Sequence, residues 1–94
     1  MNTERKYQEQ GDVLTAETAE TPKHQIILYN DEVNTFDHVI NTLIRACDHS
    51  EEQAHQCSLI VHYKGKCDVK TGEYEDLKPQ CSKLLQAGLS AEIV

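Results

Sequence analysis

The chain has 94 residues, enough for one small domain with a single hydrophobic core. Its formal net charge of -7 argues against nucleic acid as a ligand, because phosphates require a basic surface, but it is compatible with a basic or ammonium-bearing partner. The longest apolar run covers only residues 26–29, whereas a membrane span needs roughly 20 apolar residues, and the N-terminus has no apolar stretch typical of a secretory signal. We therefore expect a cytoplasmic protein that binds neither nucleic acid nor a membrane, and we expect it to be a monomer.

Residues 1–22 have the composition of a flexible tail. Glu, Thr, Gln and Ala dominate, apolar residues show no sustained period, and Pro22 closes the segment. The composition favours a disordered solubilising tail and leaves open a tether that engages another machine. The folded domain is expected over residues 23–94.

A buried strand followed by an amphipathic helix is predicted next. The apolar run at 24–29 is rich in β-formers and is ended by Asn30 and Asp31. We expect Asn34 to be the helix N-cap, with Asp37 three positions later, where a carboxylate complements the helix dipole. Apolar residues then recur on one face at a period of 3.6, at Phe36, Val39, Ile40, Leu43, Ile44 and Cys47.

Two more helices and two more strands follow. Ser50 and Gln53 form a capping box for a second helix, which ends near Gly65. A strand is predicted over 66–71, with Cys67, Val69 and Thr71 on one side. A third helix follows Gly72, and its apolar face is expected at Tyr74, Leu77, Cys81, Leu84 and Leu85.

The end of the chain completes the fold prediction. Pro79 predicts a kink or a late start of the third helix, because a mid-helix proline removes a hydrogen bond. Gly88 is expected to end that helix before a last short strand over 89–94. The order β-α-α-β-α-β predicts a small α+β domain in which a three-stranded antiparallel sheet packs on three helices, with the helices on one face.

The four cysteines are nearly evenly spaced, without a CxxC pair, at Cys47, Cys57, Cys67 and Cys81. In a reducing compartment they are best interpreted as small core residues, although their even number would permit disulfides in a secreted chain. Cys47 and Cys57 lie close in sequence to His49 and His55, but no pair has zinc-finger spacing. We interpret this group as two core cysteines and two exposed histidines, and we expect no metal ion and no cofactor.

A polar corner lies where the first strand meets the first helix. Asn30, Asp31 and Glu32 place an amide and two carboxylates at the rim of the core. If the first two helices pack as a hairpin, His62 near the end of the second helix can approach them. Together these groups could receive an α-amino group, which carries three donors and a positive charge at neutral pH. The alternative is that they only cap a turn and a helix end.

Catalysis is not indicated by the sequence. Cys57 and His62 are five residues apart on one predicted helix, about 140° around it, which is poor geometry for a nucleophile and its base. The chain contains no GxSxG, Walker or HExxH motif. We expect no catalytic residues and no enzyme activity.

Two short motifs are specific when taken together, LYND at 28–31 and VHYKGK at 61–66. The helix through Val39 and Ile40, the spacing between the motifs, and a last strand that opens with Leu89 add to them. On these features, the chain from about residue 24 to 94 resembles the ClpS adaptor family of the Clp protease. The resemblance implies an adaptor that binds proteins with a free N-terminal Leu, Phe, Tyr or Trp and delivers them to the Clp ATP-dependent protease. The implied partner is the N-terminal domain of a Clp-family AAA+ unfoldase of the ClpA or ClpC type, and the tail becomes the segment that engages it.

The resemblance also implies two groups of binding residues by matching position. Asn30, Asp31 or Glu32, and His62 would hold the free α-amino group. The hydrophobic pocket would be lined by Phe36, Val39, Ser58, Val61 and Leu89. The chain departs from the family where Glu32 stands for a common Asp, Thr35 for Pro, and Phe36 and Ser58 each for a common Met.

A structural interaction domain without recognition of an N-terminal amine is the alternative, because the same fold class occurs in a ribosomal stalk protein. The polar corner at 30–32, taken with His62, argues against it.

Overall fold

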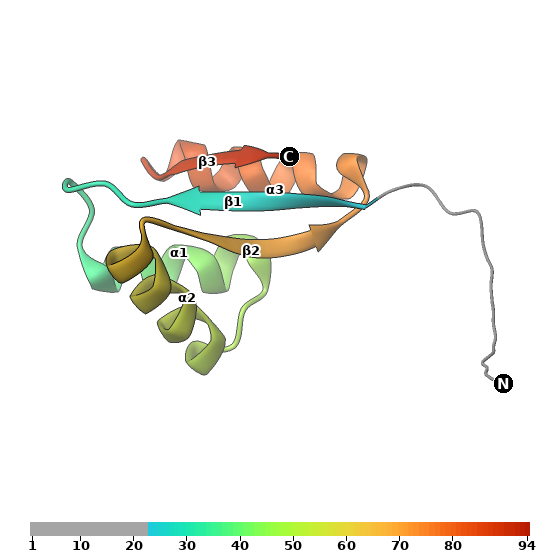
Figure 1. The fold of residues 1–94 in the computed structure, drawn as a ribbon. Helices are drawn as coiled ribbons and strands as arrows, with labels where there is room; N and C mark the ends of the chain where they lie inside the picture. The colour runs from blue at the N-terminus through green and yellow to red at the C-terminus, as the bar shows by residue number, and fades with distance from the viewer. Residues whose placement is uncertain (1–22) are drawn as a thin grey trace, which may run out of the picture.

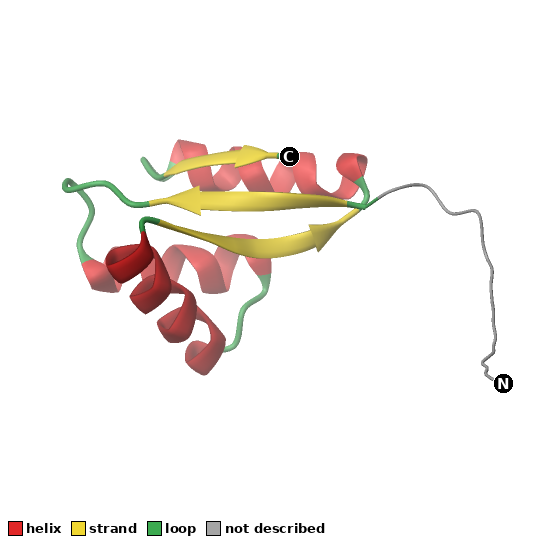
Figure 2. Ribbon diagram, viewed as in Figure 1, coloured by secondary structure: helices red, strands yellow, loops and turns green. Residues whose placement is uncertain are grey.

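A three-stranded antiparallel sheet and three helices make up the domain, which confirms the predicted α+β fold (Figures 1 and 2). The computed structural model describes residues 23–94, and the tail predicted over 1–22 lies outside them. The strands are β1 (His24–Tyr29), β2 (Lys66–Gly72) and β3 (Ser90–Ile93), and the helices are α1 (Phe36–Cys47), α2 (Glu51–Lys64) and α3 (Tyr74–Gln86). None of the three helices is long and apolar enough to cross a membrane.

The central strand of the sheet is β1, in the order β2-β1-β3. Tyr29 at the end of β1 pairs with Lys66 at the start of β2 and with Ser90 at the start of β3. Because β1 runs antiparallel to both neighbours, the chain leaves β1 at the same end of the sheet where it enters β2 and β3. Three segments that are distant in sequence therefore meet at that end.

The core lies between the sheet and the helices. In Figure 1, α1 and α3 lie behind the sheet and α2 lies beside β2. Period-two alternation in β1 buries Ile26 and Leu28, which pack with Leu43 of α1 and with Leu77 and Leu84 of α3. These five side chains are at most 1% exposed, so the predicted apolar faces meet in one core.

Three of the four cysteines are buried, and all four are free thiols. Burial raises the pKa of Cys47 to about 11 and that of Cys67 to about 12. Thiols with raised pKa values hold little nucleophilic thiolate at neutral pH, which is expected of core residues. One histidine assignment is wrong, because His49 is buried and its Nε2 lies 2.6 Å from the Val69 carbonyl oxygen.

The ends of α1 and α2 test the capping predictions. Ser50 caps α2 by accepting a hydrogen bond from the Gln53 N–H at 3.0 Å, and Gly65 ends α2 with φ +93°, both as predicted. The predicted cap of α1 is wrong, because Thr35 instead of Asn34 accepts the hydrogen bond from the His38 N–H, at 3.1 Å.

Helix α3 departs from prediction at its start and on its surface. It begins at Tyr74 and continues through Pro79, so of the two predicted effects of Pro79, a kink or a late start, the late start does not occur. Proline leaves the Glu75 carbonyl without its helical donor, but both residues are exposed, so water can serve that carbonyl. Tyr74 and Leu85 are 46% and 52% exposed and do not belong to the core, and Thr71 on β2 is also exposed.

The end of α3 follows the prediction for Gly88. Gly88 adopts φ +90° after the C-cap Ala87, the Leu89 N–H donates to the Leu84 carbonyl, and the Gly88 N–H donates to the Leu85 carbonyl, each at 3.0 Å. These two bonds form a Schellman motif, which reverses the chain and directs buried Leu89 toward β3.

Adjacent leucines on α3 test this description of the core. Leu84 is fully buried and Leu85 is 52% exposed. We expect Leu84→Ala to lower the free energy of unfolding by about 2–5 kcal/mol, because it leaves a cavity, and Leu85→Ala to change it by less than about 1 kcal/mol. Urea denaturation of the two variants measures this difference, and equal losses would contradict the assigned burial.

Candidate functional site

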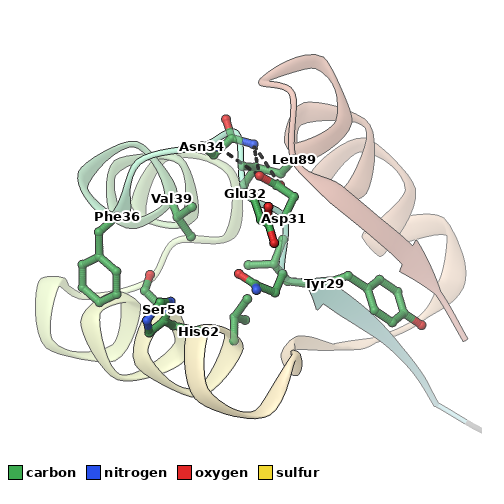
Figure 3. A pocket seen from close by; sticks show the side chains of 12 residues that line it. Tyr29, Asp31, Glu32, Asn34, Phe36, Val39, Ser58, His62 and Leu89 are labelled. Atoms are coloured by element: carbon green, nitrogen blue, oxygen red, sulfur yellow. Dashed lines mark hydrogen bonds between the residues drawn. The ribbon is translucent and has the colours of Figure 1, made fainter.

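A pocket of about 390 Å³ opens at the end of the sheet where β1 leads into α1. Loop 30–35, the start of α1, the second half of α2 and Leu89 form its walls (Figure 3). Leu28, Tyr29 and Asn34 line it together with all nine residues that the sequence suggested for binding, namely Asn30, Asp31, Glu32, Phe36, Val39, Ser58, Val61, His62 and Leu89. Residues spread over 60 positions of the chain therefore surround one space.

Backbone contacts bring the two sequence motifs together. The Asn30 N–H donates to the Gly65 carbonyl at 2.9 Å, which joins the end of β1 to the turn that follows α2. Because the Gly65 backbone is left-handed, the chain can turn there from α2 into β2 directly beside Asn30. His62, in the last turn of α2, is thereby placed on the same pocket as Asn30.

Asp31 organises the loop. Its Oδ1 accepts hydrogen bonds from the backbone N–H groups of Val33 and Asn34, both at 2.9 Å. The Asn34 amide Nδ2 lies 2.9 Å from Oδ2 and 3.1 Å from Oδ1 of the same carboxylate, and it also donates to the Gly88 carbonyl at 2.9 Å. Asn34 therefore ties the loop to the turn that carries Leu89, which is why it is not available to cap α1.

The hydrogen bonds keep Asp31 ionised. The Asn34 backbone and side-chain donors are the largest causes that lower the pKa of Asp31 below its ordinary value of 3.8. Since the pKa is lower in the folded chain, the carboxylate stabilises the fold above the ordinary value, and this contribution is lost as the pH falls through the folded pKa. At neutral pH the pocket rim therefore carries a fixed negative charge.

Three other polar side chains at the rim are exposed, those of Asn30, Glu32 and His62. No hydrogen bond within residues 23–94 engages these side chains, and the His62 ring only packs edge-on against Tyr63, at 5.0 Å between centroids. They offer an amide oxygen, a carboxylate and an imidazole nitrogen as acceptors. This end of the pocket can receive a cationic group with several hydrogen-bond donors.

The opposite part of the pocket is mainly apolar. Val61 and Leu89 are buried and Val39 is partly buried. Phe36 is 36% exposed and packs edge-on against His55, with 5.6 Å between ring centroids. Ser58 of α2 is buried beside these residues and faces Val39 and Phe36 across the pocket. This part can enclose an apolar or aromatic side chain.

Sequence reasoning missed two residues that shape the site. Asn34 was assigned to the helix cap, and its bond to Gly88 spans 54 residues, so no local pattern indicates it. His55 was considered only as an exposed histidine, whereas its ring supports Phe36. Within residues 23–94 no group of three or more potential metal ligands occurs.

Comparison with known proteins agrees with this fold. The family model described as "ATP-dependent Clp protease adaptor protein ClpS" matches residues 19–92. The ATP-dependent Clp protease adapter protein ClpS of Thermosynechococcus vestitus is 33% identical over 73% of this chain and 74% of its own length. The protein of the same name from Oleidesulfovibrio alaskensis is 37% identical over 74% and 70%, respectively.

A solved structure shares the fold as well. The structure of Agrobacterium tumefaciens ClpS2 bound to L-phenylalaninamide superposes with a TM-score of 0.65, at 17% sequence identity, over 77% of this chain and 94% of that one. An α+β fold with this pocket, together with these matches, defines an adaptor domain. The chain belongs to the ClpS family of ATP-dependent Clp protease adaptor proteins.

Removing the Asn34 amide tests the tie between the loop and the α3–β3 turn. We expect Asn34→Ala to lower the free energy of unfolding by about 1–3 kcal/mol, because it deletes the side-chain contacts to the charged Asp31 carboxylate and the hydrogen bond to the Gly88 carbonyl. Asn41→Ala, at an exposed position of α1, is the matched control and should have little effect. Urea denaturation measures both, and indistinguishable midpoints would show that the tie contributes nothing.

Proposed function

We propose that this protein is an adaptor that binds proteins with a free N-terminal bulky hydrophobic residue and delivers them to the Clp protease for degradation. The observation that carries the proposal is the division of one pocket into an exposed polar end, with Asn30, Glu32 and His62, and an apolar end. An N-terminal residue has the same division, because its α-ammonium group and its side chain leave one carbon atom in different directions.

The polar end matches an α-amino group. The group carries three donors, and the pocket rim offers three acceptor side chains. In this proposal Asn30, Glu32 and His62 make the direct hydrogen bonds. Asp31 contributes its charge, because its oxygens already accept hydrogen bonds from Val33 and Asn34. Glu32 is one methylene longer than the family's common Asp, which suits a carboxylate that must reach in from an exposed position.

The apolar end matches a bulky side chain. The cavity volume of about 390 Å³ falls within the range of about 300–1,000 Å³ typical of ligand sites. The related ClpS2 was solved with L-phenylalaninamide, a compound that has a free α-amino group and a phenyl side chain. The pocket of this chain offers polar acceptors for an amino group and an apolar end for a ring, and this match to the two parts of that compound supports N-terminal recognition.

Energetic estimates are consistent with this role. Burial of a Leu or Phe side chain contributes roughly 1.5–3 kcal/mol, and each hydrogen bond to a charged group about 1.5–3 kcal/mol. Two or three such bonds would offset the cost of association and leave micromolar-class binding, near -8 kcal/mol. Acetylation removes the charge and leaves the acceptors unpaired, so a blocked N-terminus is rejected.

Delivery to the protease requires a second interaction. We assign residues 1–22 as the tail that engages the N-terminal domain of a ClpA- or ClpC-type unfoldase, on the basis of the tail's composition and of the family resemblance. The adaptor would act as a cytoplasmic monomer. It would contribute binding and no catalytic step, because the protease cleaves the substrate.

Peptides that differ only in the first residue or in its α-amino group test the recognition. A fluorescent peptide with free N-terminal Phe should bind with a micromolar-class Kd, whereas its acetylated form and a Gly-first form should bind at least tenfold more weakly. Fluorescence anisotropy titration with the full chain measures the three. Equal binding of free and acetylated peptides would favour an interaction domain that does not recognise the amine.

Variants at the polar end test which residues bind the α-amino group. His62→Ala and Glu32→Gln should each weaken binding of the free Phe peptide roughly 10- to 100-fold, the effect of one hydrogen bond to a charged group. Glu51→Gln, at an exposed position of α2 outside this pocket, is the matched control and should bind like the parent. Unchanged affinity in both pocket variants, with far-UV circular dichroism like the parent's, would contradict the assignment.

Removal of the tail separates recognition from delivery. A chain that begins at residue 23 should bind the Phe-first peptide within twofold of the full chain, because the pocket lies within residues 23–94. It should fail to accelerate degradation of a Phe-first substrate by the unfoldase and protease. Normal acceleration by the shortened chain would show that delivery does not require residues 1–22.

A further inference from the structure

Ser58 is a buried polar residue in the wall of the apolar end. Its side chain is 3% exposed, it lines the pocket, and its Oγ has no hydrogen-bond partner among the described residues. Helical serines often satisfy their hydroxyl on a carbonyl one turn earlier, but Ser58 does not. A buried hydroxyl without a partner is rare and destabilising, so its position requires an explanation.

Ser58 differs from the other side-chain atoms that lack a partner. Three more such atoms occur within residues 23–94, on Thr42, His49 and Gln80. None of those three residues lines the pocket, whereas Ser58 does. The Ser58 side chain faces Val39 and Phe36 of α1 across the space that a ligand would fill (Figure 3). The missing partner of Ser58 can therefore come from a ligand.

The distance from His62 to Ser58 suits an aromatic side chain. The two residues are one helical turn apart on the same face of α2, about 6 Å along the axis. With the α-amino group at His62, a side chain that extends along α2 reaches Ser58 near its tip. The hydroxyl of a tyrosine is at the far end of the ring, and a phenol can both donate and accept a hydrogen bond.

The apolar walls suit the ring itself. Phe36 presents an aromatic surface whose orientation is supported by the edge-on contact with His55, and aromatic pairs gain beyond simple burial. Leucine has neither a ring nor a polar tip. Phenylalanine fills the space but has no polar group that could pair with the Ser58 hydroxyl. Tyrosine offers both a ring for the apolar walls and a hydroxyl for Ser58.

We propose that the pocket prefers an N-terminal tyrosine, and that Ser58 is the specificity-determining residue through a hydrogen bond between its Oγ and the tyrosine hydroxyl. The inference rests on the proposed recognition of free N-termini and specifies the substrate within that class. One net hydrogen bond predicts that a Tyr-first peptide binds roughly three- to tenfold tighter than the Phe-first peptide.

The test compares peptides that are identical except at residue one, which is Tyr, Phe, Leu or 4-methylphenylalanine. The last probe has nearly the shape of tyrosine but carries a methyl group in place of the hydroxyl. Anisotropy titration of the full chain should give the tightest Kd for Tyr, with 4-methylphenylalanine no better than Phe. Ser58→Ala should reduce the ratio of the Phe and Tyr Kd values to about one. Ser82→Ala on α3, outside the pocket, should preserve the parent ratio.

The possible results distinguish a failure of the Ser58 role from a failure of N-terminal recognition. Equal Kd values for Tyr and Phe, equal Kd values for Tyr and 4-methylphenylalanine, or an unchanged ratio in Ser58→Ala would overturn the role of Ser58 while leaving N-terminal recognition intact. Binding of the acetylated Tyr peptide as tightly as the free one, or binding of none of the free peptides, would overturn both.

Discussion

The geometry of the pocket depends on the hydrogen bonds that join Asp31, Asn34 and Gly88. One asparagine amide holds the Asp31 carboxylate and the Gly88 carbonyl at once, so the loop after β1 and the turn before β3 share a common anchor. The backbone N–H bonds to Asp31 set the shape of the loop from which Glu32 projects. The two acids therefore differ in role, since Asp31 stabilises the loop through its hydrogen bonds and the Glu32 side chain stays exposed.

The antiparallel sheet explains why the pocket is at this end of the molecule. Its central strand ends where both neighbours begin, and Gly65 and Gly88 reverse the chain just before β2 and β3. Both glycines have positive φ, a conformation that a side chain would strain. The last turns of α2 and the residue Leu89 are thus brought against loop 30–35. A small domain gains a concave site there without a long insertion.

The pocket combines polar acceptors at its rim with an apolar wall that contains Phe36 and Ser58. A methionine on either wall is flexible and adapts to many partners, whereas Phe36 is rigid and Ser58 is small and polar. Ser58, on the α2 side of the pocket, is also much smaller than the methionine that is common in the family. In the proposed function, the walls would set the selectivity for the side chain, and the rim would set the requirement for a charged amine.

The sequence by itself determined the order of the helices and strands, most of the core, both ends of α2 and the turn at Gly88, because periodicity and capping residues are local signals. The residues around the pocket were implied by the family resemblance that the LYND and VHYKGK motifs carry. Only the tertiary structure decided that Thr35 caps α1, that Leu85 is exposed beside buried Leu84, and that Asn34 reaches Gly88. It also decided that the Ser58 hydroxyl is left without a partner inside the pocket. The physical reason is that a hydrogen bond across 54 residues, or its absence at one buried atom, depends on how the packed elements meet, and no local pattern of residues records that.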